Sequence, residues 1–151
     1  MNHRGEIENL LYAYQERLDA GDLVGVAALF EHATIGGSEG SAMHGSADLL
    51  ATFKKVLRLY EDGTPRTTHT TLNPIIEVDE DAGTATSRSV YVVYQQTDTL
   101  PLQPVVTGRY LDKFELVDGA WRFSQRDYVV SLLGDLRAHQ LVELHETPGD
   151  H

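Results

Sequence analysis

The sequence predicts an α+β domain in which N-terminal helices wrap a cone-shaped, curved sheet of mixed or antiparallel strands. The 151 residues suit a single domain, 1–151 with a core of about 6–139, that needs no disulfide or metal. Apolar residues recur at three- and four-residue spacing in the first 60 positions, and from Arg66 the period changes to two. Helices followed by a run of strands favour this class. The open end of such a cone is a pocket for ligands.

Three helices are predicted in the first third of the chain. The first carries an apolar stripe and ends at Gly21, and Asp22 is expected to cap a short second helix. The stripe consists of Ile7, Leu10, Leu11, Tyr14 and Leu18. Residues 35–45, "IGGSEGSAMHG", predict a turn or hairpin. Ser46 is expected to cap the third helix, which carries apolar residues as far as Tyr60.

Four strands rich in threonine, valine and aromatic residues are predicted next. Their ranges are 67–78, 84–96, 105–117 and 120–130. Asp118-Gly119 is typical of a tight hairpin turn between the last two. Leucines in residues 131 to about 145 predict a final helix, and residues 146–151 are expected to be a frayed tail.

Charge and composition exclude several classes of function. The formal net charge is -11, with 23 acidic and 12 basic residues, which argues against nucleic acid or an anionic membrane as the main partner. The absence of cysteine excludes disulfides, thiolate metal sites and a cysteine nucleophile. No signal peptide and no apolar run of about 18–20 residues is present, so a cytoplasmic protein is expected.

The stretch "RTTHTTLNP" places an ionisable ring at the start of a strand. Thr67, His69, Thr71 and Asn73 alternate with the opposite face, so the face that carries His69 is polar. A polar face in a sheet covered by helices is either exposed to solvent or lines a cavity. The pattern alone leaves both interpretations open.

Asp19 is a candidate partner for this histidine. It ends the apolar stripe of the first helix, where the negative end of the helix dipole disfavours a carboxylate. A turn carboxylate before glycine is the alternative interpretation. A carboxylate that accepts a hydrogen bond from one ring nitrogen fixes the histidine tautomer and leaves the other nitrogen free as a general base.

Arg126 and Arg88 lie inside predicted strands. Each is expected either to bind a substrate oxyanion or to pair with the acidic surface. Strict alternation puts Trp121 and Phe123 on one face and Arg126 on the other, unless a bulge lies between them. Phosphate loops, nucleophile elbows and the spacing of metal ligands are absent, so no metal site is expected.

Four segments follow one another in an order known from one protein family. They are "YAYQERLDAGDLVGVAALF", "GSADLLATF", "THTTLNPIIEVDEDAGTATS" and "GRYLDKFELVDGAWRFSQRDYV". In this order the chain resembles the SnoaL-like proteins of the nuclear transport factor 2 superfamily. It is most similar to the branch with scytalone dehydratase, bile-acid 7α-dehydratase and hexachlorocyclohexane dehydrochlorinase. The resemblance implies a cystatin-like barrel with a deep apolar pocket, no cofactor, and a homodimer or homotrimer.

The resemblance also implies roles for particular residues. The catalytic Asp–His pair of the branch falls on Asp19 and His69, and the pocket arginine of the dehydrochlorinase falls on Arg126. The chain departs from the dehydratase at Gly37, Arg88 and Gly108. The expected substrate-binding residues are Arg88, Tyr110, Tyr14, Phe114 and Asn73.

The expected function is a lyase or isomerase of the dehydratase type. His69, held by Asp19, would remove a proton from a carbon atom of the substrate, while Arg126 stabilises the negative charge that develops. The expected substrate is a small hydrophobic metabolite, and polycyclic metabolites are included. The alternatives are a polyketide cyclase and a ligand-binding or dimerisation module without catalytic activity.

Overall fold

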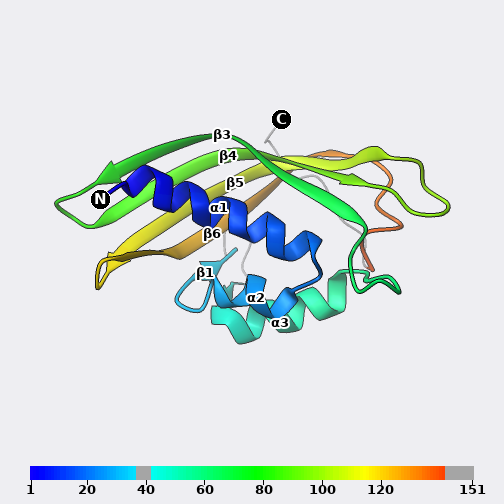
Figure 1. Cartoon of the computed structure of the whole chain (residues 1–151), viewed down its shortest axis with the longest axis horizontal. Helices are drawn as coiled ribbons and strands as arrows, with labels where there is room; N and C mark the ends of the chain where they lie inside the picture. Colours follow the sequence, from blue (N-terminus) through cyan, green and yellow to red (C-terminus); the bar gives the residue numbers. More distant parts are fainter. Residues whose placement is uncertain (37–41, 142–151) are drawn as a thin grey trace.

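The computed structural model describes residues 1–36 and 42–141. Four long strands form a curved sheet, and the helices lie together on one side of it (Figure 1). The helices are α1 (His3–Asp19), α2 (Leu23–Ala28) and α3 (Gly45–Val56). The strands are β1 (Thr34–Ile35), β2 (Met43–His44), β3 (Thr67–Asp79), β4 (Thr84–Gln95), β5 (Gln103–Val117) and β6 (Ala120–Leu133). The α+β class predicted from the sequence is confirmed.

The six strands form one mixed sheet in the order β2-β1-β6-β5-β4-β3. All neighbours pair antiparallel except β1 and β6, which pair parallel. The predicted hairpin in residues 35–45 corresponds to the β1–β2 pair, although positions 37–41, including Gly37, lie outside the described residues. Asp118 and Gly119 both have positive φ, 52° and 80°, as a tight turn between twisted strands requires.

The apolar stripe of α1 and the cap of α2 agree with the sequence prediction. Helix α1 buries Ile7, Leu11, Tyr14 and Leu18, four members of the predicted stripe. The Asp22 carboxylate accepts a hydrogen bond from the backbone N–H of Gly25 at 2.8 Å, which confirms it as the cap of α2. Gly21 between the helices has φ +77°, and a Cβ there would lie 1.8 Å from the carbonyl oxygen of Gly63.

Helix α3 begins and ends earlier than predicted. Its N-cap is His44, so the predicted cap at Ser46 is wrong: Ser46 lies inside the first turn. The Asp48 carboxylate accepts from the backbone N–H of His44 at 3.0 Å and takes over the capping role. The helix ends at Val56, and Leu57 leaves it to form a β-bridge with Gln140.

The prediction of a helix after residue 130 is wrong for residues 131–141, which are the part of it that the structure describes. Ser131 to Leu133 continue strand β6, where Leu132 and Leu133 pair with Thr107 and Val106 of β5. Residues 134–141 then form turns and the bridge to Leu57. The N–H groups of His139 and Gln140 donate to the carbonyl of Leu136, and other backbone groups of the segment bond to neighbouring segments. One such bond joins the N–H of Leu141 to the carbonyl of Val56 at 2.7 Å. The remainder of the predicted helix and the predicted tail lie outside the described residues.

A β-bulge at Ser124 decides the orientation of Arg126. In the β5–β6 ladder Lys113 pairs with Gln125 and Phe114 pairs with Phe123, so Ser124 has no opposite residue. The extra residue shifts the alternation by one. Phe123 and Arg126 are therefore both fully buried on the inner face of the sheet, which confirms the bulge as the correct alternative.

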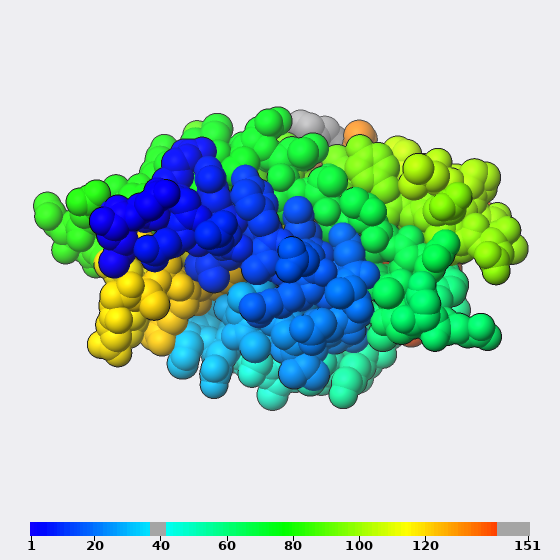
Figure 2. Space-filling view, viewed as in Figure 1, coloured from blue at the N-terminus to red at the C-terminus, as the bar shows by residue number. Residues whose placement is uncertain are grey.

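The hydrophobic core lies between this inner face and the helices. Figure 2 shows the residues of α1, in blue, packed closely against the strands. The outer face of the sheet is less covered. It exposes apolar side chains on three strands, namely Leu72, Ile75, Val90 and Leu111. Within the described ranges, none of the helices is long and apolar enough to span a membrane.

Candidate active site

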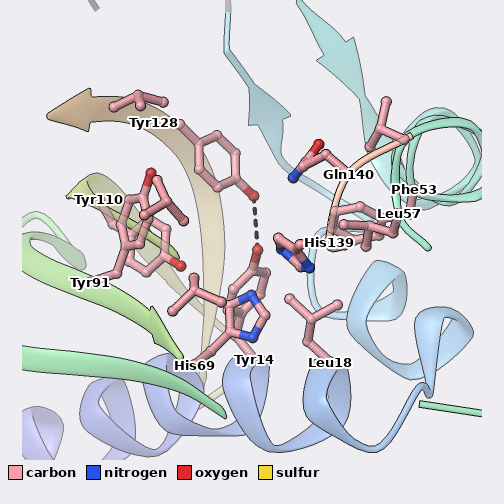
Figure 3. Close-up of a pocket in the computed structure, with 14 residues that line it drawn as sticks. Tyr14, Leu18, Phe53, Leu57, His69, Tyr91, Tyr110, Tyr128, His139 and Gln140 are labelled. Carbon is pink, nitrogen blue, oxygen red and sulfur yellow. Dashed lines mark hydrogen bonds between the residues drawn. The ribbon is translucent and has the colours of Figure 1, made fainter. Parts of the chain in front are cut away.

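A cavity of about 170 Å³ lies between the helices and the inner face of the sheet (Figure 3). Aliphatic side chains and Phe53 form much of its wall, and four tyrosines and two histidines supply most of its polar groups. These aromatic residues are Tyr14, Tyr91, Tyr110, Tyr128, His69 and His139. The cavity is thus an apolar chamber with a few polar atoms, which is the usual composition of a small-molecule site.

The carboxylate of Asp19 holds the beginning of strand β3 at the cavity. Its Oδ1 lies 2.6 Å from Nδ1 of His69, and its Oδ2 accepts the backbone N–H of His69 at 2.8 Å. The hydroxyl of Thr67 donates to Oδ1 at 2.9 Å. These contacts explain why a carboxylate lies at the unfavourable end of α1, because three donors from β3 compensate for the helix dipole.

These contacts define the chemistry of His69. An ionised carboxylate only accepts hydrogen bonds, so Nδ1 of the neutral ring carries the proton and Nε2 is left as an acceptor. The side chain is 6% exposed and lines the cavity. The polar face of this strand could have been exposed to solvent or could have lined a cavity, and at His69 it lines the cavity. The arrangement provides a buried general base with a carboxylate that orients it.

Two tyrosine hydroxyls meet in the same chamber. Figure 3 shows the hydroxyls of Tyr14, from α1, and Tyr128, from β6, pointing toward each other, and they lie 3.3 Å apart. Burial is the main cause that raises the pKa of both phenols well above the ordinary value. Both therefore stay protonated at neutral pH and remain hydrogen-bond donors.

Tyr110 and Tyr91 form the wall beside this pair. Their rings stack at a centroid distance of 4.5 Å. Gly108, which pairs with Tyr91 across the β4–β5 ladder, makes room for that ring. A Cβ at Gly108 would lie 2.5 Å from the Tyr91 hydroxyl and 2.0 Å from the carbonyl oxygen of Val129. A residue without a side chain is therefore needed here.

Arg126 lies behind the tyrosines, outside the lining of the cavity. It is completely buried, and its Nε and Nη2 donate to the two carboxylate oxygens of Asp112 at 2.7 and 2.9 Å. Its guanidinium lies 3.9 Å from the ring centroid of Tyr110 and 4.5 Å from that of Tyr14. The structure thus places this arginine as a cationic support for the cavity aromatics.

The remaining sequence-predicted residues divide between the core and the surface. Tyr14 and Tyr110 line the cavity, whereas Phe114 is buried against Phe123 and does not reach it. Arg88 points away from the cavity, because it alternates with the buried Ser87 and Ser89, and its Nη1 lies 3.8 Å from Glu77. Asn73 is exposed with φ 53°, since a bulge interrupts the pairing of β3 between Leu72 and Ile75.

His139 is a cavity residue that the sequence analysis missed. It comes from the turns after β6, and its ring lies 5.6 Å from that of His69, at an angle of 60°. Burial, assisted by the neighbouring His69, lowers the pKa of His139 to about 3. The leucine pattern that predicted a helix here obscured it, because a helix would have placed His139 on a surface unrelated to β3.

Metal ligation has no support in the described part of the chain. No group of three or more histidine and acidic side chains there is arranged to hold an ion. The chemistry that the described cavity residues can provide is that of a base, hydrogen-bond donors and an apolar enclosure.

Comparison with known proteins places the fold in a family. Residues 1–127 match the SnoaL-like domain. No curated protein sequence matches the chain significantly. Among solved structures, the chain is similar to a proposed scytalone dehydratase from Novosphingobium aromaticivorans. The TM-score is 0.73 and the identity 23%, over 99% of this chain and 95% of that one.

Two further structures agree with this placement. A protein of unknown function from Mycobacterium tuberculosis has a TM-score of 0.70 at 25% identity, over 87% of this chain and 73% of that one. A protein from Novosphingobium aromaticivorans, described as similar to nuclear transport factor 2 and cystatin-like in fold, has a TM-score of 0.69 at 19% identity. The match covers 84% of this chain and 80% of that one. The chain belongs to the SnoaL-like domain family and has the cystatin-like fold of nuclear transport factor 2-like proteins.

Proposed function

We propose that the cavity is the active site of a cofactor-independent lyase or isomerase in which His69 removes a proton from carbon. One observation carries the proposal: Asp19 holds Nδ1 of His69 at 2.6 Å, while the ring borders an apolar cavity. The carboxylate fixes the tautomer, so Nε2 is ready to accept a proton. It also stabilises the imidazolium that forms.

The Tyr14 and Tyr128 hydroxyls are the proposed donors to the developing negative charge. Only one hydroxyl can donate within their mutual hydrogen bond, so the other proton is free for a substrate oxygen. Preorganised donors in a chamber that excludes water stabilise an enolate-like transition state more strongly than solvent does. In this scheme the role that the sequence assigned to Arg126 passes to the phenols, and Arg126 supports their rings.

The volume of the cavity indicates the size of substrate that it can hold. A closed cavity of about 150 Å³ binds benzene, and the present one is about 170 Å³. A substrate with one ring and a few substituents matches this volume. A polycyclic metabolite, which the sequence analysis included, would extend beyond this volume toward the opening of the cavity. The volume therefore supports a one-ring substrate as the first to be tested.

Elimination of water is the reaction that we favour within this class. The family includes dehydratases as well as polyketide cyclases, and the order of the sequence segments resembles the dehydratase branch. After His69 takes the proton, its imidazolium is next to the substrate and can return that proton to a departing hydroxyl. One group then serves as base and acid in turn.

A monocyclic β-hydroxy ketone such as 3-hydroxycyclohexanone tests the proposal. NMR in D₂O records both deuterium uptake at the carbon next to the carbonyl and loss of water. We expect the wild-type protein to accelerate at least one of these steps. His69→Ala should reduce the rate on the order of 10²- to 10⁴-fold, and Asp19→Asn should also reduce it strongly because the amide favours the wrong tautomer.

His32→Ala is the matched control, because His32 is exposed and does not line the cavity. It should keep the wild-type rate. Wild-type rates for both His69→Ala and Asp19→Asn would contradict the mechanism. Binding of ring compounds without acceleration of either step would favour the non-catalytic binding module.

A further inference from the structure

His139 lines the cavity, and one nitrogen of its ring has no hydrogen-bond partner. Its side chain is 2% exposed, and Nδ1 is fully buried without a hydrogen-bond partner. Leaving a buried donor or acceptor unpaired is unfavourable, and buried polar groups with a structural role are nearly always paired. A histidine that only filled space would be better replaced by an apolar side chain, because its cavity neighbours include Phe53, Val56 and Leu57.

The backbone around this ring is fixed from several sides. The carbonyl of Ala138 accepts from Nε2 of Gln95 at 3.0 Å and from the hydroxyl of Tyr60. The carbonyl of His139 accepts from the N–H of Arg58 at 3.0 Å. These contacts join the segment after β6 to the end of β4 and to the segment after α3. The ring is consequently held in place before any ligand arrives, which is what a binding group requires.

The neighbours of the ring define what it can bind. Figure 3 shows the rings of His139 and His69 near each other, and Leu57 and Gln140 line the same cavity. The Nδ1 of His69 is bound to Asp19. The same carboxylate also acts on His139, but its effect on the pKa of that ring is smaller than the opposing effects of burial and of His69. Since burial keeps the ring uncharged, it offers a neutral N–H donor and an unshared nitrogen lone pair.

We propose that His139 is a substrate-binding residue that recognises an oxygen substituent next to the carbon deprotonated by His69. The inference rests on the proposed function and specifies its substrate class: small monocyclic compounds that carry a hydroxyl or carbonyl oxygen. Halogenated hydrocarbons that lack oxygen are outside this class. The two histidine rings, 5.6 Å apart, contact neighbouring atoms of one small ligand, so the oxygen lies on the carbon that loses the proton or on an adjacent one.

A pair of ligands that differ by one hydroxyl tests the assignment. 4-Methylphenol and toluene have nearly the same shape, and each fits a cavity that accommodates a single ring. Binding to the wild-type protein is measured by isothermal titration calorimetry. We expect 4-methylphenol to bind more tightly on the order of tenfold, because one good hydrogen bond in a buried site is worth about 1.4 kcal/mol.

His139→Phe should abolish this preference. The aromatic ring is kept but the nitrogens are lost, so toluene affinity should change little and 4-methylphenol should bind no more tightly than toluene. His32→Phe makes the same exchange on the surface and should leave both affinities unchanged. Equal affinities for the two ligands in the wild-type protein, no binding of 4-methylphenol, or an unchanged preference in His139→Phe would overturn the inference.

A second measurement needs only the wild-type protein. In ¹⁵N NMR spectra that detect the imidazole nitrogens, 4-methylphenol should shift the resonances of His139 and toluene should not. Loss of activity in His69→Ala with an intact ligand preference would support both proposals. An inactive wild-type protein that nonetheless prefers 4-methylphenol through His139 would refute the proposed reaction but not the binding role.

Discussion

The two histidines of the cavity have opposite electrostatic surroundings. His69 shares a short hydrogen bond with Asp19, and His139 lies in an apolar wall with an unpaired nitrogen. The carboxylate orients the ring of His69, whereas burial lowers the pKa of His139 and keeps that ring neutral. We propose different roles for the two residues on this basis.

The neutral state of His139 predicts a specific dependence of stability on pH. Burial lowers its pKa from the ordinary 6.5 to about 3. Below pH 6.5 the unfolded chain therefore takes up a proton that the folded ring refuses, and the free energy of unfolding decreases as the pH falls. The loss amounts to about 1.4 kcal/mol per pH unit until the folded pKa is reached.

His139→Phe should remove this contribution. Urea denaturation of both proteins at pH 7, 6, 5 and 4 measures it, because the other titrating groups contribute nearly equally and cancel in the difference. The stability of the wild-type protein should fall relative to the variant below pH 6.5. Parallel stability curves would show that the histidine is accessible to protons in the folded state.

Gly108 lies at a position where the structure leaves no space for a side chain. Gly108→Ala should destabilise the protein by about 1–3 kcal/mol, because the new methyl group collides with the Tyr91 ring and with a backbone carbonyl. Thermal unfolding measures the loss. Gly119→Ala cannot serve as the control, because Gly119 has φ +80° and alanine would be strained there. The comparison is Ala28→Gly in α2, which should destabilise the protein only by the difference in helix propensity, about 1 kcal/mol.

The family resemblance indicated one of these histidines and not the other, whereas the residue pattern alone left the surroundings of His69 open. Asp19 and His69 stand at recognisable places, the end of a helical stripe and the start of an alternating strand. His139 follows leucines whose spacing imitates a helix, whereas β6 continues through Leu133 because it pairs with β5. Tertiary pairing overrides local periodicity there, and a single sequence does not reveal it.

At the level of elements, the bulge at Ser124 places a cation within the core. Without the extra residue, Arg126 would follow the outward alternation expected from Trp121 and Phe123. With it, the guanidinium lies against Asp112 of β5 and against the aromatic rings of the core. The sequence predicted two alternatives for this strand, and only the ladder register distinguishes them.

The buried pair of Arg126 and Asp112 should show strong thermodynamic coupling. Burial raises the pKa of Asp112 above its ordinary value, and the opposing effect of Arg126 offsets this only in part. Arg126→Met leaves the carboxylate buried without a counterion, and Asp112→Leu leaves the guanidinium without one. Each should destabilise the fold by about 3–5 kcal/mol.

The double variant Arg126→Met/Asp112→Leu should recover much of that loss, because neither charge is then left unpaired. Urea denaturation of the four proteins completes the cycle. Additive losses in the double variant would mean that each side chain stabilises the fold independently. The surface pair Arg88 and Glu77, 3.8 Å apart and largely exposed, is the matched control and should show little coupling.

At the scale of the whole molecule, the cavity joins distant parts of the chain. Its lining comes from α1, α3, strands β3 to β6 and the segment after β6. A ligand there contacts all these elements at once, so binding should stabilise the entire fold against unfolding. With 4-methylphenol at ten times its dissociation constant, the free energy of unfolding should rise by about 1.4 kcal/mol.

Urea denaturation with and without the ligand measures this increase. His139→Phe should show a smaller gain at the same ligand concentration, because its affinity is lower. An unchanged midpoint for the wild-type protein at this ligand concentration would mean that the ligand does not bind the folded state in preference to the unfolded chain, which would contradict binding in the cavity.

The order of helices and strands was predictable because amphipathic patterns are strong over long segments. The cavity volume and the position of Arg126 were not, because both depend on bulges and on loops that fold back. Val92 and Tyr94 lie half-buried on the face of β4 opposite Tyr91 and Val93. Self-association into a homodimer or homotrimer stays a prediction.

The hydrogen bond from the backbone of His69 to Asp19 also protects the free edge of the sheet. Strand β3 is the last in the order, so one side of it has no neighbouring strand, and such an edge is a template for aggregation. Asp19 occupies the donor of His69, Pro74 has no donor, and Arg4 binds the Pro74 carbonyl at 3.3 Å. The residue that orients the base therefore also closes part of this edge to strand addition by another chain.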